Sequence, residues 1–242
     1  MKRYPLILFC LWSICLLQGC GGTSSAADAD AAHEPFIALS VRTEPDLAHA
    51  AYTVEELYAD SDVVVEGVVK SVSGTNDTLY YSGMVYTQMQ IEPIAVYKGQ
   101  YENETLWMCG GTMPLSTYVL NLEPDHPDKT VSYSAEEWEY GMVSQQFANN
   151  SAPQAGDRIL FFGARDENDA NAFRNTNVTQ GIYLCDDETL STSALLVDEN
   201  GFTEPLAKDI LARCGGTVAA PMEENGLSIL TFDRKAFLEI IG

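Results

Sequence analysis

Basic residues are scarce in this chain of 242 residues, which has 13 lysines and arginines against 35 aspartates and glutamates. The resulting formal charge of −22 repels nucleic acid phosphates and anionic headgroups. The sequence therefore argues against a nucleic-acid partner and against a domain that lies flat on a membrane. Histidine is also rare, and His33, His49 and His126 form no pair with ligand spacing on an expected helix. We expect no metal and no cofactor.

The common catalytic signatures are missing as well. The chain has no Gly-x-Ser-x-Gly elbow, no Ser-x-x-Lys, no His-Glu-x-x-His and no Gly-Lys pair for a phosphate loop. The acidic residues 166–169 lack the glycine that an EF-hand loop has at its sixth position, where Asn171 stands. Carboxylate pairs such as Glu55/Glu56 arise by chance among so many acids, and glycosidase pairing is a distance in space. No catalytic residue is assigned.

An uncharged apolar run follows a short basic tip at the start of the chain. Lys2 and Arg3 precede residues 6–17 (LILFCLWSICLL), which suit a signal-peptide core and are too short to span a bilayer of ~30 Å. The run ends in Leu17-Gln18-Gly19-Cys20, which resembles the lipobox of bacterial lipoprotein signal peptides. This resemblance implies diacylglyceryl transfer to the Cys20 thiol, cleavage after Gly19 and a mature protein that begins at Cys20.

The leader thus predicts a protein held by fatty acyl chains such as palmitate at the extracytoplasmic face of a bacterial membrane. Two acyl chains give stable attachment, because each buried CH₂ contributes about 0.8 kcal/mol. The alternatives are a soluble secreted product and a short anchor. Removing the leader removes two basic residues and no acidic ones, so the mature charge is −24. Residues 21–34 are small, polar or acidic, and we interpret them as a flexible tether that spans roughly 20 Å.

The rest of the chain predicts a mainly β fold with a few helices. β-Branched and apolar residues, often alternating with polar ones, favour strands, and capping residues mark helix starts. Strands are expected at residues 62–72, 79–97, 105–109, 158–163, 181–185 and 227–232. Helices are expected at residues 54–59, 134–147, 206–213 and 233–241. Residues 73–78 and 165–180 are expected to be loops, and residues 195–203 a hairpin.

This order of elements is that of an OB-type barrel. We expect a closed or partly closed five-stranded barrel with a helix between strands 3 and 4, followed by a C-terminal hairpin and helix extension. The expected segments are a signal peptide at 1–19, a lipid-anchored tether at 20–34, the barrel at 35–190 and an α+β extension on the same domain at 191–242.

Four runs, SDVVVEGVV, YTQMQIEPIAVYKG, the strand with Cys109 and RILFFG, are loosely similar to netrin-like modules. Tissue inhibitors of metalloproteinases belong to that group and chelate zinc with an N-terminal Cys-x-Cys. Here the mature N-terminus would be Cys20-Gly21-Gly22, with its thiol blocked by lipid, so that activity does not carry over. We interpret the domain as a barrel without an inherited function.

The expected ligand surface is a face of the barrel with its adjoining loops. Its candidate residues are Tyr86, Gln88, Gln90, Asn76, Asp77, Asp169, Asn171 and Arg174. Three cysteines remain after processing: Cys109, Cys185 and Cys214. A Cys109–Cys185 disulfide is expected, because strands 3 and 5 of an OB-type barrel are neighbours; three reduced, buried thiols are the alternative.

Three functions stay open at this point. The first is a binding module at the cell envelope for an unknown protein or small molecule. The second is a cell-surface hydrolase that uses carboxylates, and the third is a structural envelope protein. A deep pocket with convergent acids of shifted pKa would favour the enzyme, whereas a shallow aromatic groove would favour binding.

Overall fold

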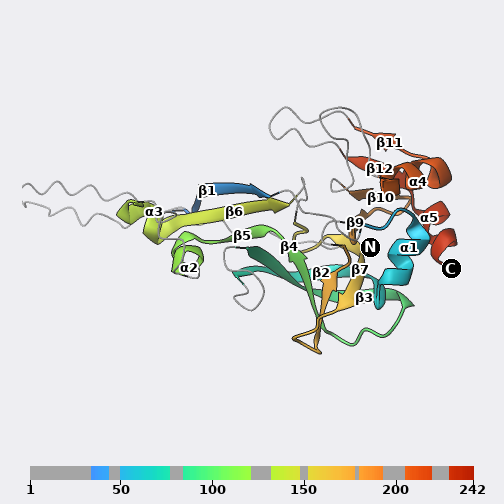
Figure 1. The fold of residues 1–242 in the computed structure, drawn as a ribbon, viewed down its shortest axis with the longest axis horizontal. Coiled ribbons are helices and arrows are strands. Elements are labelled where there is room, and N and C mark those ends of the chain that lie inside the picture. Colours follow the sequence, from blue (N-terminus) through green and yellow to red (C-terminus); the bar gives the residue numbers. More distant parts are fainter. Residues whose placement is uncertain are drawn as a thin grey trace, which may run out of the picture. The chain divides into compact units, whose positions relative to one another are not determined.

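The computed structural model describes residues 34–43, 50–76, 84–120, 132–147, 152–177, 180–192, 205–219 and 229–242 (Figure 1). Residues 34–242 belong to one unit. The leader, Cys20, the tether up to residue 33, Asp77 and the hairpin expected at residues 195–203 lie outside the described residues. Within those residues, no helix has both the length and the apolar character needed to span a membrane.

Five strands close into a barrel, which confirms the fold class expected from the sequence. They are β2 (Val63–Asn76), β3 (Val85–Lys98), β4 (Thr105–Cys109), β7 (Arg158–Arg165) and β8 (Ala172–Asn175). The strand order is β7-β2-β3-β4-β8, and β8 pairs back with β7. β4 and β8 run parallel and the other four pairs antiparallel. The barrel is OB-like.

Period-two alternation explains the long second barrel strand. Val85, Thr87, Met89 and Ile91 of β3 are all buried, whereas Gln88 and Gln90 are half-buried and point to the other face. Met89 and Ile91 pack in the barrel core with Phe161 of β7 and Phe173 of β8, whereas Val85 packs in a separate cluster with Met113 and Val143. Burial on one face therefore fixes the register of the strand.

The fifth barrel strand was wrongly placed from the sequence. It is β8, which lies inside the polar stretch 165–180 that was expected to be a loop. Residues 181–185 do form a strand, β9 (Ile182–Cys185), but β9 pairs with β7 outside the barrel. The far edge of β7 is divided, because Ile159–Phe161 pairs with β9 and Gly163–Arg165 pairs with β8. A strand of four residues is too short to show a clear period.

A second sheet has the order β1-β6-β5 and is called the satellite sheet below. Its strands are β1 (Phe36–Thr43), β5 (Gly111–Pro114) and β6 (Gly141–Phe147), and it carries the short helices α2 (Leu115–Leu120) and α3 (Ala135–Tyr140). The helix expected at residues 134–147 is thus wrong beyond Tyr140. The capping box at Ser134 is present, but Gly141 is extended and the chain continues as a strand.

The C-terminal part extends the barrel sheet beyond β9. β10 (Thr189–Thr192), β12 (Leu230–Asp233) and β11 (Thr217–Val218) follow in that order. The helices α1 (Val54–Asp60), α4 (Pro205–Cys214) and α5 (Arg234–Ile241) share one apolar core with Val64, Leu160 and Phe162 from the outer side of the barrel. The three helices match the expected ones, and Asp233 caps α5 as predicted.

Candidate functional site

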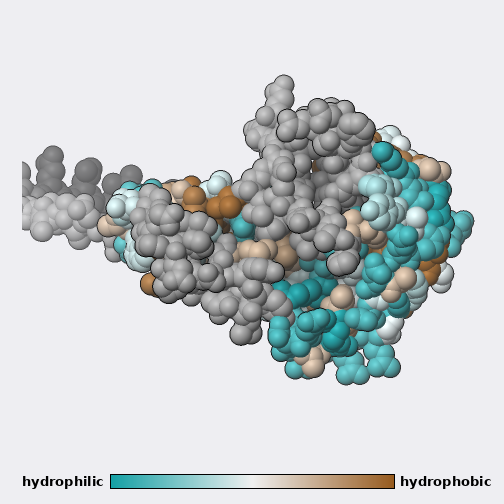
Figure 2. Space-filling model, viewed as in Figure 1, coloured by the Kyte–Doolittle hydropathy of each residue, from teal (hydrophilic) through white to brown (hydrophobic). Residues whose placement is uncertain are grey.

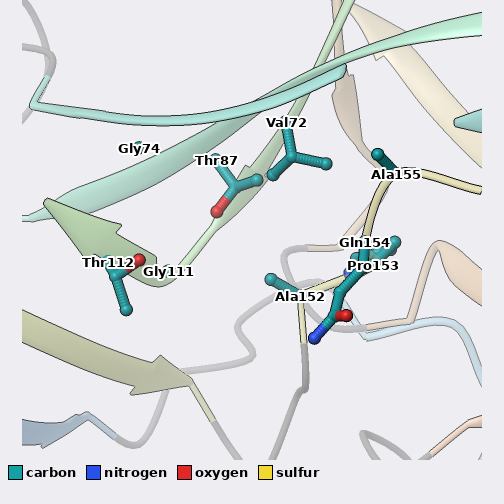
Figure 3. A pocket seen from close by; sticks show the side chains of 9 residues that line it. All are labelled: Val72, Gly74, Thr87, Gly111, Thr112, Ala152, Pro153, Gln154 and Ala155. Atoms are coloured by element: carbon teal, nitrogen blue, oxygen red, sulfur yellow. The ribbon is translucent and has the colours of Figure 1, made fainter. Parts of the chain in front are cut away.

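The barrel has a cavity at its mouth, on the side where β2 runs past its pairing with β7 (Figure 3). Its volume is about 320 Å³. The lining residues are Val72, Gly74, Thr87, Gly111, Thr112, Ala152, Pro153, Gln154 and Ala155. Val72 pairs with Met89, and Gly74 pairs with Thr87, so these β2 residues face the same way as the buried inner row of β3. The cavity is therefore the open end of the barrel interior.

Two glycines allow β5 to form one wall of this mouth. A Cβ atom on Gly74 would lie 1.6 Å from the Thr112 carbonyl oxygen. A Cβ atom on Gly111 would lie 2.1 Å from the Thr87 Oγ1, and Gly111 also has a φ of +130°, which other residues rarely adopt. The strands can approach this closely only because neither position carries a side chain.

The turn at residues 152–157 forms the opposite wall. The Gly156 N–H donates to the Val69 carbonyl at 2.8 Å, and the Val69 N–H donates to the Asp157 carbonyl at 2.8 Å. The Asp157 carboxylate closes the turn by accepting the Gln154 N–H at 2.7 Å. These bonds fix the turn to β2 at its register shift between Val69 and Ser71. Backbone hydrogen bonds thus hold the turn side of the mouth in place on β2.

The lining offers shape and hydrogen bonds without charge. Val72, Ala152, Pro153 and Ala155 supply apolar surface. The Thr87 hydroxyl donates to the Gly110 carbonyl at 2.7 Å, which leaves its oxygen lone pairs as acceptors. The exposed Gln154 brings an amide, which Figure 3 shows beside Ala152. Such a site suits a small, uncharged ligand group with one or two polar atoms.

The structure places the expected ligand surface on the outer side of β3, β4 and β8. Gln88, Trp107 and Arg174 are register partners and form one row across these three strands. Gln90 lies in the neighbouring row, where its amide donates to the Thr105 hydroxyl at 3.0 Å. Four of the eight candidates, Tyr86, Gln88, Gln90 and Arg174, therefore share a face. Trp107 belongs to it as well and was missed by the sequence analysis.

Two of the candidate side chains on this outer face, those of Tyr86 and Arg174, are less available to a ligand than the sequence suggested. Tyr86 is only 3% exposed, so its ring supports the surface and does not present itself to a ligand. The Arg174 guanidinium carbon lies 5.1 Å from the centre of the Tyr86 ring and 5.0 Å from that of Trp107. Arg174 is also ion-paired with the buried Asp166. The Arg174 side chain is thus already bonded and stacked within the fold.

The remaining candidates lie in or beside the loops. Asp169 and Asn171 are exposed, and the Asp169 carboxylate accepts the Asn171 N–H at 2.9 Å. Asp166 accepts the N–H groups of Asn168 and Asp169, so this loop turns its first acid inward. Asn76 ends β2, and its side chain is outside the described residues. The loop is therefore closed by its own hydrogen bonds.

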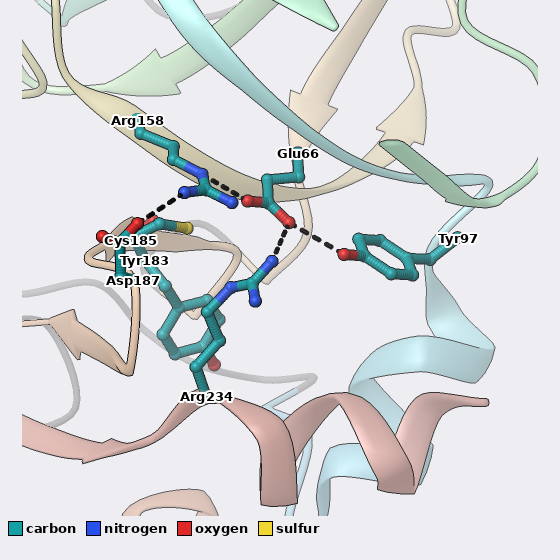
Figure 4. A network of polar contacts seen from close by, with 7 residues as sticks. All are labelled: Glu66, Tyr97, Arg158, Tyr183, Cys185, Asp187 and Arg234. Atoms are coloured by element: carbon teal, nitrogen blue, oxygen red, sulfur yellow. Dashed lines mark hydrogen bonds and ion pairs between the residues drawn. The ribbon is translucent and has the colours of Figure 1, made fainter. Parts of the chain in front are cut away.

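A buried ion network joins the barrel to the C-terminal layer (Figure 4). Glu66 of β2 is 1% exposed and accepts from Arg158 Nε at 2.5 Å, from Arg234 Nη2 at 2.7 Å and from the Tyr97 hydroxyl at 2.8 Å. Burial alone would raise the pKa of Glu66, but these three hydrogen bonds outweigh it and hold the pKa below its usual value. An acid that stays ionised and fully bonded is a structural link, not a proton donor.

The three cysteines in the described residues, Cys109, Cys185 and Cys214, carry free thiols, and the expected Cys109–Cys185 disulfide is absent. The premise was wrong, because Cys185 lies on β9, which is not a neighbour of β4 in the sheet. Burial raises the pKa of Cys109 to about 11 and that of Cys185 to about 12. Both thiols are protonated at neutral pH and are weak nucleophiles.

In the part of the chain that the structure describes, no three His, Cys, Asp or Glu side chains converge to hold a metal ion. Comparison with known proteins gives no match to a family model and no match to a curated protein. The barrel mouth and the leader sequence are therefore the features of this chain that bear on its function.

Proposed function

We propose that this protein is a lipid-anchored binding module on the extracytoplasmic side of a bacterial membrane, and that its ligand enters the barrel mouth. The observation that carries the binding role is the cavity between β2, β5 and the turn at residues 152–157. The mouths of β-barrels are among the preferred places for small-molecule sites, and about 320 Å³ is within their usual size range. The lipobox-like Leu17-Gln18-Gly19-Cys20 supports the location.

The electrostatics support binding more than hydrolysis. A general acid that works near neutral pH needs a raised pKa. Five carboxyl groups in the described ranges, Glu55, Glu66, Glu92, Glu104 and Glu137, have a lowered pKa. None of these five acids lines the cavity. Hydroxyl, amide and backbone groups can hold a ligand there, but they do not transfer protons readily.

The test is chemical-shift mapping of the ¹⁵N-labelled mature protein with a panel of uncharged probes. The panel holds N-acetylglucosamine, a blocked dipeptide and a short primary alcohol, each beside a charged analogue. We expect saturable shifts at Thr87, Thr112 and the turn at residues 152–157, from uncharged probes only. Ala155→Trp, which fills the mouth from an exposed turn position, should abolish the shifts.

Gln88→Ala is the matched control, because Gln88 lies on the outer face of the barrel and should leave the shifts unchanged. Shifts confined to the outer face would move the binding site to the row of Gln88, Trp107 and Arg174. Turnover of any probe, or saturation by none of them, would contradict a binding role for the mouth.

A further inference from the structure

Four large apolar side chains are exposed on the satellite sheet and its helices. The exposed fractions are 39% for Phe36, 51% for Ile37, 74% for Leu120 and 41% for Trp138. We call these four residues the apolar end. Single exposed apolar residues are ordinary, but several that gather at one place mark an interaction surface.

The topology brings the four residues to the same end of the sheet, where Phe36 and Ile37 lie on opposite faces of β1. Phe36 pairs with Gly141, at the point where α3 ends and β6 begins. Pro114, which ends β5 and precedes α2, pairs with Met142. α2 and α3 contact each other and β6. Figure 2 shows hydrophobic surface over β1 and beside α2, whereas the surface over the outer barrel strands is mostly hydrophilic.

Helix α3 contributes no buried side chain to an apolar core. It buries none of its residues, yet its start is fixed by a reciprocal pair of hydrogen bonds between Ser134 and Glu137. Trp138 follows directly and is held on a capped turn. A tryptophan combines a large apolar ring with one polar N–H, which suits the boundary between lipid and water.

The position of Cys20 along the chain indicates which partner the apolar end contacts. Phe36 begins β1 two residues after the expected tether, and a random coil of the length of residues 21–34 has a root-mean-square span of roughly 20 Å. If Cys20 carries the lipid, β1, which starts at the apolar end with Phe36, is the described strand nearest to the anchor along the chain. The ligand of the apolar end is then a lipid surface. This step rests on the anchor in the proposed function.

Charge decides which lipid surface fits. Trp138 lies between Glu137 and Glu139, and Glu136 is two residues before it. The mature chain also carries a formal charge of −24. Anionic headgroups would repel this region, whereas zwitterionic headgroups would not. We propose that the apolar end docks the anchored domain onto the interface of a zwitterionic bilayer, which orients the barrel mouth relative to the membrane.

The test uses the acylated mature protein with 5-fluorotryptophan, reconstituted into phosphatidylcholine vesicles that contain spin-labelled phosphatidylcholine. After loss of the leader, the two tryptophans are Trp107 on β4 and Trp138, so each protein gives two ¹⁹F signals. Trp138→Phe, at an exposed site, assigns them. We expect the Trp138 signal to broaden at least threefold more than the Trp107 signal, and the ratio to fall when phosphatidylglycerol replaces half of the lipid.

The double variant Ile37→Ser/Leu120→Ser removes apolar surface at exposed positions and should bring the broadening ratio close to one. Ile94→Ser, at a 52% exposed site on β3, is the matched control and should leave the ratio unchanged. Equal broadening of both tryptophans in the parent would overturn the docking. The mass of the N-terminal peptide reports acylation separately, so an unacylated chain would instead contradict the anchor.

Discussion

Glu66 is a single residue whose hydrogen bonds and ion pairs connect distant parts of the fold. It interrupts the valine run of β2 and is nearly fully buried, so it needs partners to remain charged. Arg158 comes from β7, Tyr97 from β3 and Arg234 from the start of α5. One carboxylate therefore joins three strands or helices that are far apart in the chain. A single acid in an apolar strand was the available signal, but the sequence did not reveal its partners.

Glu66→Gln should reduce the free energy of unfolding by about 3 kcal/mol at pH 7, because it leaves the partly buried Arg234 without its countercharge and Arg158 with only the exposed Asp187 at 3.4 Å. The pKa of Glu66 is lower in the folded protein than its ordinary value of 4.5. Its contribution is therefore complete above that value and is lost as the pH falls through the folded-state pKa. Urea denaturation from pH 7 to pH 3 should show the parent and the variant converging.

Glu55→Gln provides the control for this effect. Glu55 pairs with Arg213 on the surface, where both side chains are well exposed, so the change should cost about 1 kcal/mol or less. Equal losses for the two variants would show that the Glu66 network adds no more than a surface ion pair.

Among the strands and helices, those with a long and regular pattern were predictable. β2 and β3 each have 14 residues and a clear apolar row, and α5 has a capping aspartate before an amphipathic stretch. The loop expected at residues 73–78 was wrong for residues 73–76, which continue β2. β8 and β5 have four residues each and depend on partners distant in sequence. β6 follows a capping box that correctly indicates a helix, and only its pairing with β1 and β5 explains the change to a strand.

The candidate site was predictable in part. The row of β3 that carries Gln88 and Gln90 was identified from alternation alone, and the structure shows these residues on the outer face. The mouth was missed, because it is formed by two glycines, a proline turn and β5, which become neighbours only through tertiary pairing. No spacing rule in a single sequence connects Gly74 with Ala152.

Val65→Asp should unfold the domain, because Val65 is fully buried inside the barrel and an unpaired charge there costs several kcal/mol. Val96→Asp is the matched variant, since Val96 is the register partner of Val65 but is 44% exposed. It should change stability by about 0.5 kcal/mol or less. Similar denaturation midpoints for the two variants would mean that the barrel interior is wrongly assigned.

For the whole molecule, charge and anchoring act together. If the leader is removed as proposed, the formal charge of −24 would hold the acidic surface of the chain away from anionic groups. Two acyl chains on Cys20 would oppose that repulsion and keep the domain at the membrane. The apolar end and the barrel mouth then have distinct tasks, the first in orienting the domain and the second in binding its ligand.

Metabolic labelling with an alkyne fatty acid tests this account most directly. The parent should be labelled and should begin at Cys20, because the Cys20 thiol is the lipid acceptor and cleavage follows its modification. Cys20→Ser should remain an unlabelled precursor of full length, while Cys15→Ser, inside the apolar run, should be labelled and processed like the parent. Equal labelling of Cys20→Ser and the parent would contradict the lipid anchor.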